Sequence, residues 1–328
     1  MLTDFLLIIA GLFLLYLGAG SIVTSSSRIA RRMGLSELWI GLTVVAFGTS
    51  LPELVVGLHS NITGVQDITL SNIAGANINN ITLILGISGL IAPLTIRDKS
   101  TRREVSFLIL ATVVFFVLAV LGHDITRLDG IILFALFGYF TFSCCFVDFF
   151  REPPICRKCS LDRYHKIDLP EIDEEELKKK KPWWDIALIV FGIVALTFGG
   201  RVSVDSAVSI ATALEIPQKV VGATIVALGT TLPELFTSVF AASRGELDIS
   251  IGNIIGSCIF NILTIVGIAS IIKPIGVNPT LLTFDFPFMI LMSVIIIPMI
   301  SPDFHIDKTE SIILLLCYVF YVLTNLLR

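Results

Sequence analysis

Charged residues are scarce in this chain. Of its 328 residues only 15% are Asp, Glu, Lys or Arg, whereas 55% are hydrophobic and the mean hydropathy is +0.90. So little charge excludes an ordinary soluble domain. The net charge of -4 is small and gives no sign of nucleic-acid binding. Long apolar runs are abundant instead, which is typical of a polytopic membrane protein.

Cysteine and histidine are also few, at six and four residues. Cys258 and Cys317 lie in apolar segments, so the cysteines do not suggest a disulfide framework. Cys156 and Cys159 form a CxxC pair in a polar loop, where they could bind a metal together with His165. A single CxxC pair supplies too few ligands for a zinc site, so we interpret all six as unpaired structural or loop cysteines.

Apolar windows of membrane-spanning length recur along the chain and do not alternate with polar residues, which indicates helices rather than barrel strands. The first follows an acidic start without a clear cleavage pattern, which favours a transmembrane helix over a signal peptide. The windows are 5–24, 37–60, 68–92, 104–121, 128–148, 184–202, 217–242, 249–272, 281–300 and 310–327. The sequence therefore predicts an all-α polytopic membrane protein with ten transmembrane helices.

The chain contains an internal repeat. Laying residues 41–94 over 222–275 without a gap gives 24 identities in 54 positions. Each half holds five windows, so the second copy must enter the membrane from the opposite face, and we expect two inverted five-helix repeats. The expected division is a first repeat over 1–150, a charged connector over 151–182 and a second repeat over 183–328.

The distribution of basic residues predicts the orientation. The connector holds nine Lys or Arg residues, and further basic residues fall on the same side of the predicted membrane, namely Arg28, Arg31, Arg32, Arg97, Lys99, Arg102 and Arg103. The opposite side holds Arg127, Lys219 and Lys273. The positive-inside rule therefore predicts a protein of the cell membrane with its connector in the cytoplasm and both termini outside the cell.

Two apolar windows are interrupted by the same motif, 47-FGTSLPEL-54 and 228-LGTTLPEL-235. A proline within a helix has no amide hydrogen and clashes with the carbonyl four residues earlier. Pro52 and Pro233 therefore predict helix breaks that free backbone carbonyls within Ala46–Gly48 and Ala227–Gly229. Freed carbonyls at membrane depth are expected to face a cavity or a cation.

Each motif carries a glutamate near the centre of its window, Glu53 and Glu234, where a carboxylate is costly and normally serves a function. Thr49 and Thr230 precede the glutamates by four residues, so each pair is expected to share a helix face. Further hydroxyls stand at Ser50 and Thr231. These are hard oxygen ligands, suited to Ca²⁺ and Na⁺, and no cysteine or histidine accompanies them to suggest zinc or copper. The alternative is that the glutamates only form hydrogen bonds across a helix interface.

A second pair of segments follows the motifs, 72-NIAGANINNI-81 and 253-NIIGSCIFNI-262. Both contain a glycine that permits close helix packing, Gly75 and Gly256. Both also contain two intramembrane amides in register, Asn72 and Asn80 in the first copy and Asn253 and Asn261 in the second. We expect Asn80 and Asn261 to add neutral oxygen to the cation site. Asn72 and Asn253 could equally act as polar contacts between helices.

The paired motifs, each followed by its asparagine-containing segment, resemble the repeats of the cation/calcium antiporter superfamily, most closely its sodium/calcium exchanger branch of compact prokaryotic type. The resemblance implies that Glu53 and Glu234 are calcium ligands. It further implies that sodium or calcium binds through neighbouring hydroxyls and amides, namely Thr49, Thr230, Ser50, Thr231, Ser257, Asn80 and Asn261. The carbonyls of Ala46 and Ala227, which the helix breaks are expected to free, would add to the same site. The resemblance also implies transport of Ca²⁺ and Na⁺ without a cofactor.

Two positions depart from the pattern of that family. Ala76 stands where a serine is expected, which removes a hydroxyl from one flanking sodium site. Asn261 stands where many exchangers carry aspartate, which removes a possible charge from the centre and argues against potassium cotransport. The number and placement of sodium ions are therefore open, whereas the calcium assignment rests on the glutamates.

The charge of the predicted site suggests antiport. Two ionised glutamates without a cation are unfavourable to enclose, so a site that closes only when loaded must exchange one cation for another. A calcium/proton exchanger that uses the same glutamates is the main alternative, and a cation channel is another. An intramembrane enzyme would need a nucleophile or a metal-ligand set that the sequence does not offer. We expect a monomeric transporter and not an enzyme.

Overall fold

The computed structural model describes residues 1–95, 99–122, 124–150, 182–297 and 305–327. The expected CxxC loop and nearly all of the connector lie outside these residues. Within the described part, seven helices are long and apolar enough to span a membrane, and an eighth is counted if the bent pair Glu37–Thr49 and Leu51–Thr63 forms one span. The protein is a multi-pass, helical membrane protein, as predicted.

Helical segments occupy each of the ten expected windows. In the first half they are α1 (Leu2–Met33), α2 (Glu37–Ile40) with η1 (Gly41–Val45), α3 (Ala46–Thr49) and α4 (Leu51–Thr63), α5 (Gln66–Asn79) with η2 (Asn80–Ile84) and α6 (Leu85–Ile91), α7 (Lys99–Gly122), and α8 (Arg127–Phe150). In the second half they are α11 (Pro182–Ala213), α12 (Gln218–Val221) with η3 (Gly222–Val226), α13 (Ala227–Gly229) and α14 (Leu232–Ser243), α15 (Leu247–Phe260) with η4 (Asn261–Val266) and α16 (Gly267–Ile272), η5 (Leu281–Asp285) with α17 (Phe286–Ile295), and α18 (Lys308–Leu327).

The two halves repeat each other in local detail. The π-helical segments η1 and η2 recur, at the same offset of 181 residues, as η3 and η4. Four two-residue strands are related by the same offset of 181 residues. β1 (Leu94–Thr95) corresponds to β3 (Ile275–Gly276), and β2 (Asp124–Ile125) corresponds to β4 (His305–Ile306). β1 pairs with β4 and β2 pairs with β3, both antiparallel, so exchanging the two halves converts one small sheet into the other.

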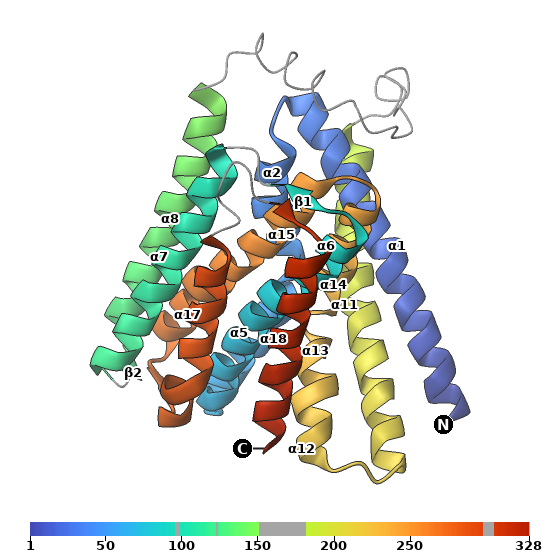
Figure 1. Cartoon of the computed structure of the whole chain (residues 1–328), viewed down its shortest axis with the longest axis vertical. Helices are drawn as coiled ribbons and strands as arrows, with labels where there is room; N and C mark the ends of the chain where they lie inside the picture. The colour runs from blue at the N-terminus through green and yellow to red at the C-terminus, as the bar shows by residue number, and fades with distance from the viewer. Residues whose placement is uncertain (96–98, 123, 151–181, 298–304, 328) are drawn as a thin grey trace.

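The ends of the repeats show that the arrangement is inverted. Both termini lie at the lower end of the molecule in Figure 1, whereas α8 ends and α11 begins at the upper end. The strand β1 lies toward the upper end and β2 toward the lower end. Each half therefore crosses the molecule an odd number of times, and the second half begins on the face opposite to the first.

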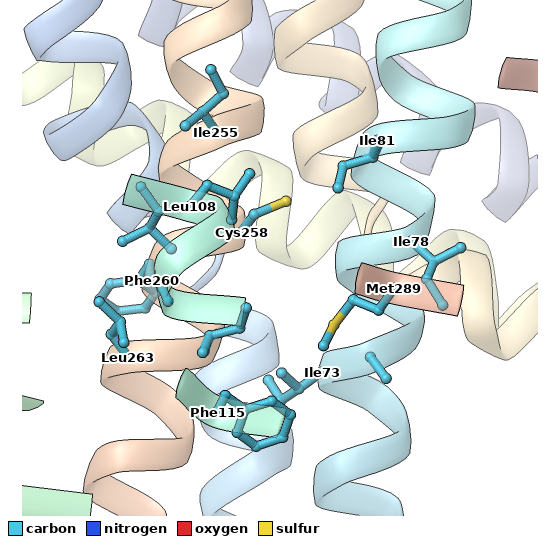
Figure 2. Close-up of a cluster of buried hydrophobic side chains, with 14 of the residues drawn as sticks. Ile73, Ile78, Ile81, Leu108, Phe115, Ile255, Cys258, Phe260, Leu263 and Met289 are labelled. Carbon is cyan, nitrogen blue, oxygen red and sulfur yellow. The ribbon is translucent and has the colours of Figure 1, made fainter. Parts of the chain in front are cut away.

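Two long passages, 66–91 and 247–272, form the centre of the molecule, with 78% and 89% of their apolar windows buried. Figure 2 shows side chains of α5 and α15, among them Ile73 and Phe260, packed with residues of α7 and α17. The equivalent windows of α8 and α18 are only 22% and 11% buried. A helix that is apolar on all sides can lie either in the protein core or against lipid. Burial assigns 66–91 and 247–272 to the core and α8 and α18 to the periphery.

Helices α1 and α11 cross in close contact because glycines face each other. A Cβ on Gly11 would lie 2.7 Å from the Gly199 carbonyl oxygen, and a Cβ on Gly18 would lie 2.9 Å from that of Gly192. Such small residues let two backbones approach in a membrane, where van der Waals packing drives helix association. The two first helices of the repeats therefore form one closely packed pair.

Buried charge joins the same two helices near the end where α11 begins. Asp185 is fully buried and accepts a hydrogen bond from Arg28 Nε at 2.8 Å, and its second oxygen lies 3.0 Å from Arg32 Nη1. Further along α11, Arg201 and Asp205 are four residues apart and form an exposed ion pair at 3.7 Å. Only the buried pair is shielded from water, so it makes the larger contribution to joining the helices.

Candidate functional site

The two proline motifs break their helices in the same way. Ser50 and Thr231 both leave the helical conformation, with φ and ψ of -86° and 10° and of -88° and 2°. A new helix starts one residue later, so Pro52 and Pro233 fall in its first turn, where no amide hydrogen is needed. In the first copy the two helix pieces are bent by 47°.

The break changes how the threonines and glutamates relate. Thr49 ends α3, whereas Glu53 lies in the first turn of α4, so they do not share one continuous helix face as their spacing suggested. The reason is the proline, which forces the helix to restart between them. Glu53 and Glu234 instead lie at helix N-termini, where the helix dipole favours negative charge.

Both glutamates are enclosed, at 0% and 1% exposure. Ser50 Oγ donates a hydrogen bond to Glu234 Oε1 at 2.9 Å, so the first motif reaches into the second. Glu53 Oε1, Glu53 Oε2 and Glu234 Oε2 make no close hydrogen bond with the described residues, although the Thr230 hydroxyl lies near Glu53 and the Thr49 hydroxyl near Glu234. The two carboxylates are also close enough to interact electrostatically. Three carboxylate oxygens in the protein centre are therefore left for a ligand to satisfy.

Two asparagines begin the π-helical segments beside these carboxylates. η2, which starts at Asn80, packs against α14, and η4, which starts at Asn261, packs against α4. Asn80 is fully buried, and neither its amide oxygen nor its amide nitrogen has a partner among the described residues. Asn261 Nδ2 donates to Asn77 Oδ1 at 3.0 Å, which leaves Asn261 Oδ1 buried and unpartnered. π-Helical turns of this kind often occur at functional sites.

The first half-site consists of Ala46, Thr49 and Ser257, and it joins α3 to α15. Thr49 Oγ1 lies 3.4 Å from Ser257 Oγ and 3.0 Å from Asn253 Oδ1. Gly256 makes the close approach possible, because a Cβ there would lie 2.5 Å from the Leu42 carbonyl oxygen. The expectation for Gly256 is thus confirmed.

The carbonyl of the first half-site is not free of helix bonding, contrary to expectation. Ala46 O accepts the backbone N–H of Ser50 at 3.0 Å and the Thr49 hydroxyl at 3.3 Å. The residue four positions later is Ser50, which has an amide hydrogen, so the proline does not remove this bond. The second lone pair of Ala46 O is shared with a hydroxyl rather than with another amide.

The second half-site consists of Ala227, Thr230 and Ala76, and it joins α13 to α5. Thr230 Oγ1 donates to Asn72 Oδ1 at 3.3 Å. The expectation of close helix packing at Gly75 is wrong, because a Cβ there would meet nothing within 4 Å. The two half-sites correspond in sequence but differ in packing density.

The half-sites also differ in exposure. Ala46 and Thr49 are buried, whereas Thr230 is half-buried and Ala227 is exposed. In Figure 1, α12 and α13 lie in the half of the molecule that holds both termini, and α2 lies in the opposite half. The second half-site is therefore the more exposed of the two.

Sequence reasoning missed two amides of α5. Asn77 supports Asn261, and its own Nδ2 donates to the Cys258 carbonyl at 3.2 Å. Asn79 donates to the Ala227 carbonyl at 3.1 Å and lies 3.5 Å from Thr231 Oγ1. Both stand within the asparagine-rich segment of the first repeat, and their equivalents in the second repeat are Cys258 and Phe260. Comparing the repeats position by position would have singled them out.

Within the described residues, no group of three or more His, Cys, Asp or Glu side chains could hold a metal ion. A site built on two carboxylates must take its other ligands from hydroxyl, amide and carbonyl oxygens. That donor set suits calcium and sodium and is unsuited to transition metals. Three described cysteines are free thiols, Cys144, Cys258 and Cys317.

Comparison with known proteins agrees with this geometry. The family model described as "Sodium/calcium exchanger protein" matches the chain twice, over residues 3–146 and 184–327. The sodium/calcium exchanger MaX1 of Methanosarcina acetivorans is 31% identical over 97% of both chains. The inner membrane protein YrbG of Escherichia coli is 35% identical over 88% of this chain and 86% of its own.

A solved structure of the sodium-calcium exchanger NCX_Mj superposes on the whole molecule. Its TM-score is 0.80 at 27% sequence identity, with 99% of each chain covered. That protein is a ten-helix membrane exchanger with two repeats, in agreement with the architecture described above. The chain belongs to the sodium/calcium exchanger family of the cation/calcium antiporter superfamily.

Proposed function

We propose that this protein is a secondary antiporter that exchanges Ca²⁺ against Na⁺ across the cell membrane, with Glu53 and Glu234 as the calcium ligands. The observation that carries the proposal is the pair of buried carboxylates with three unpartnered oxygens. An unpaired carboxylate in a membrane protein costs several kcal/mol, which a bound cation would offset. The names of the relatives MaX1 and NCX_Mj support calcium and sodium as the transported ions.

The remaining calcium ligands would be neutral oxygens. Asn80 and Asn261 each hold a buried amide oxygen without a partner, and Thr49 and Thr230 place hydroxyls at the two ends of the site. Calcium takes roughly six to eight oxygen ligands, more than two carboxylates provide. Sodium would bind beside the centre through the half-site oxygens of Ser257, Ala46 and Ala227 and through the hydroxyls of Ser50 and Thr231.

Alternating access follows from the inverted repeat and the charge of the site. The empty site carries two carboxylates, and one Ca²⁺ or two Na⁺ would neutralise them before it closes. The greater exposure of Ala227 and Thr230 supports access from the side of the termini. We place that side outside the cell and residues 151–182 in the cytoplasm, between repeat units 1–150 and 183–328. One chain contains both half-sites, so we propose a functional monomer.

Calcium uptake by proteoliposomes containing the purified protein tests this function. A sodium gradient and a pH gradient are imposed separately, because a calcium/proton exchanger would respond to the second and not to the first. Glu53→Gln and Glu234→Gln should each abolish sodium-driven uptake, since either leaves one negative charge for a divalent ion. Glu215→Gln, at an exposed glutamate outside the site, is the matched control. Normal uptake by either central variant would contradict the site assignment.

A further inference from the structure

Helices α5 and α15 meet where two equivalent residues of the repeats contact each other. Asn77 and Cys258 are 181 positions apart, the offset that relates the two repeats. Asn77 Nδ2 donates a hydrogen bond to the Cys258 backbone carbonyl at 3.2 Å, and the Cys258 thiol donates to the Asn77 backbone carbonyl at 3.9 Å. Both residues are buried, and Figure 2 shows the Cys258 side chain directed from α15 toward α5. The pseudo-two-fold axis of the inverted repeat therefore passes between an amide and a thiol.

The hydrogen bonds of Asn77 fix the orientation of its amide group. A backbone carbonyl can only accept a hydrogen bond, so the Asn77 atom that faces the Cys258 carbonyl must be the nitrogen. The Asn77 oxygen then faces Asn261, which donates Nδ2 to it at 3.0 Å. Turning round either amide, or both, would place two oxygens against each other. The backbone carbonyl of Cys258 thus determines the orientation of both amides.

Asn261 is thereby held with its oxygen directed away from Asn77. Asn261 is 1% exposed and begins η4, which packs against α4, the helix that carries Glu53 in its first turn. Its Oδ1 has no hydrogen-bond partner among the described residues. An amide offers oxygen at one end and N–H donors at the other, whereas a carboxylate offers oxygen at both. An asparagine beside a cation therefore has to be held by its nitrogen, and Asn77 does this for Asn261.

Asn80, the equivalent of Asn261 in the first repeat, is not held in this way. Symmetry places the Cys258 thiol beside it, and a thiol is only a weak donor and acceptor. The thiol hydrogen is directed to the Asn77 carbonyl. Asn80 lies near the thiol, yet neither end of its amide makes a close hydrogen bond with the described residues. The two site asparagines therefore differ, because a hydrogen bond fixes the amide of Asn261 and none fixes that of Asn80.

We propose that Asn77 is a positioning residue for cation binding, which holds Asn261 so that its amide oxygen faces the cation. This inference rests on the proposed function, in which Asn261 is a calcium ligand. Asn77 itself contacts no ion and acts only through Asn261. A ligand that is oriented before the ion arrives raises affinity, because binding does not have to order it. Loss of Asn77 should therefore change the KM for calcium and leave kcat nearly unchanged.

The experiment measures sodium-driven calcium uptake by proteoliposomes as a function of calcium concentration. Asn77→Ala should raise the KM for calcium about tenfold, as expected for the loss of one hydrogen bond to a charged group. Asn261→Leu should also raise it. The double variant Asn77→Ala/Asn261→Leu should have the KM of Asn261→Leu alone, because Asn77 has no other route of action. Cys258→Ala, which keeps the backbone carbonyl at an equally buried position, is the matched control and should stay near the wild-type KM.

The outcomes separate a positioning role from a structural one. A double variant whose KM exceeds that of Asn261→Leu by the full factor of Asn77→Ala would overturn the proposal, and so would an equal rise in Cys258→Ala. Asn77→Leu is the second variant, which also lacks the amide and leaves no cavity. An unchanged KM in the Asn77 variants, with a raised KM in Asn261→Leu, overturns this inference alone. An unchanged KM in Asn261→Leu instead contradicts the ligand assignment of the proposed function.

Discussion

Ser50 of the first repeat donates its hydroxyl to Glu234 of the second, with 2.9 Å between Oγ and Oε1. The symmetric contact is absent: Thr231 Oγ1 donates to the Leu228 carbonyl at 3.0 Å, and the hydroxyl near Glu53 is that of Thr230 instead. The inverted repeat is therefore symmetric in its backbone and asymmetric in its polar contacts. The two glutamates therefore have different hydrogen-bond partners in this structure.

Ser50→Ala should weaken calcium binding more than Thr231→Ala does. The first change removes a hydrogen bond to a charged group, worth about 1.5–3 kcal/mol, whereas the second removes a bond to a neutral carbonyl, worth about 1 kcal/mol. The expected loss of calcium affinity is about tenfold or more for Ser50→Ala. The calcium dependence of uptake, measured at fixed sodium, checks this. Equal losses in the two variants would contradict the asymmetry.

Gly256→Ala should destabilise the protein, whereas Gly75→Ala should be tolerated. A methyl group at Gly256 would lie 2.5 Å from the backbone carbonyl of Leu42, and one at Gly75 would meet nothing within 4 Å. Overpacking of this kind costs about 1–3 kcal/mol, while alanine in an open helix position favours the helix by up to about 1 kcal/mol. Thermal unfolding of the detergent-solubilised variants compares the two repeats directly. A lower melting temperature for Gly75→Ala would refute the packing difference.

Asp185→Asn should lower the stability of the protein much more than a change at the exposed ion pair does. It leaves Arg28 and Arg32, which are mostly buried, without their carboxylate, a loss of about 3–5 kcal/mol. The control Asp205→Asn affects an exposed pair with Arg201 and should change stability by less than about 0.5 kcal/mol. Unfolding followed by thiol labelling of the buried Cys258 reports the stability of both variants. Similar stability in the two variants would show that the buried pairs contribute little.

Stability should fall as pH rises from about 4.5 to about 8 because of Glu246. Burial, with Glu37 as the next cause, raises the pKa of Glu246 to about 8, against 4.5 ordinarily. Arg31 and Ser27 hydrogen-bond both carboxylates. The folded state keeps the Glu246 proton that the unfolded state releases, so its stability is greatest below pH 4.5 and declines across this window.

Glu246→Gln lacks this ionisation and provides the comparison. The difference in melting temperature between the variant and the wild-type protein should change across the window from pH 4.5 to 8, in favour of the variant at high pH. Above pH 8 the difference should become constant. A difference that does not depend on pH would show that Glu246 ionises normally in the folded protein.

The sequence by itself determined the membrane class, the ten helical windows, the two repeats and the two glutamates. These depend on the length of apolar runs and on residues that are costly in a membrane, and both are local properties of the chain. The prolines likewise predicted where the helices break, because a proline has no amide hydrogen whatever the surrounding structure.

Only the tertiary structure decided which polar groups meet. Equivalent carbonyls at Ala46 and Ala227 have different partners, and equivalent glycines at Gly75 and Gly256 have different neighbours. The hydrogen bond from Asn79 to the Ala227 carbonyl joins helices of different repeats, 148 positions apart along the chain. Local sequence sets where a helix can break, but the side chains that satisfy the released groups come from packing between repeats, which a residue pattern does not encode.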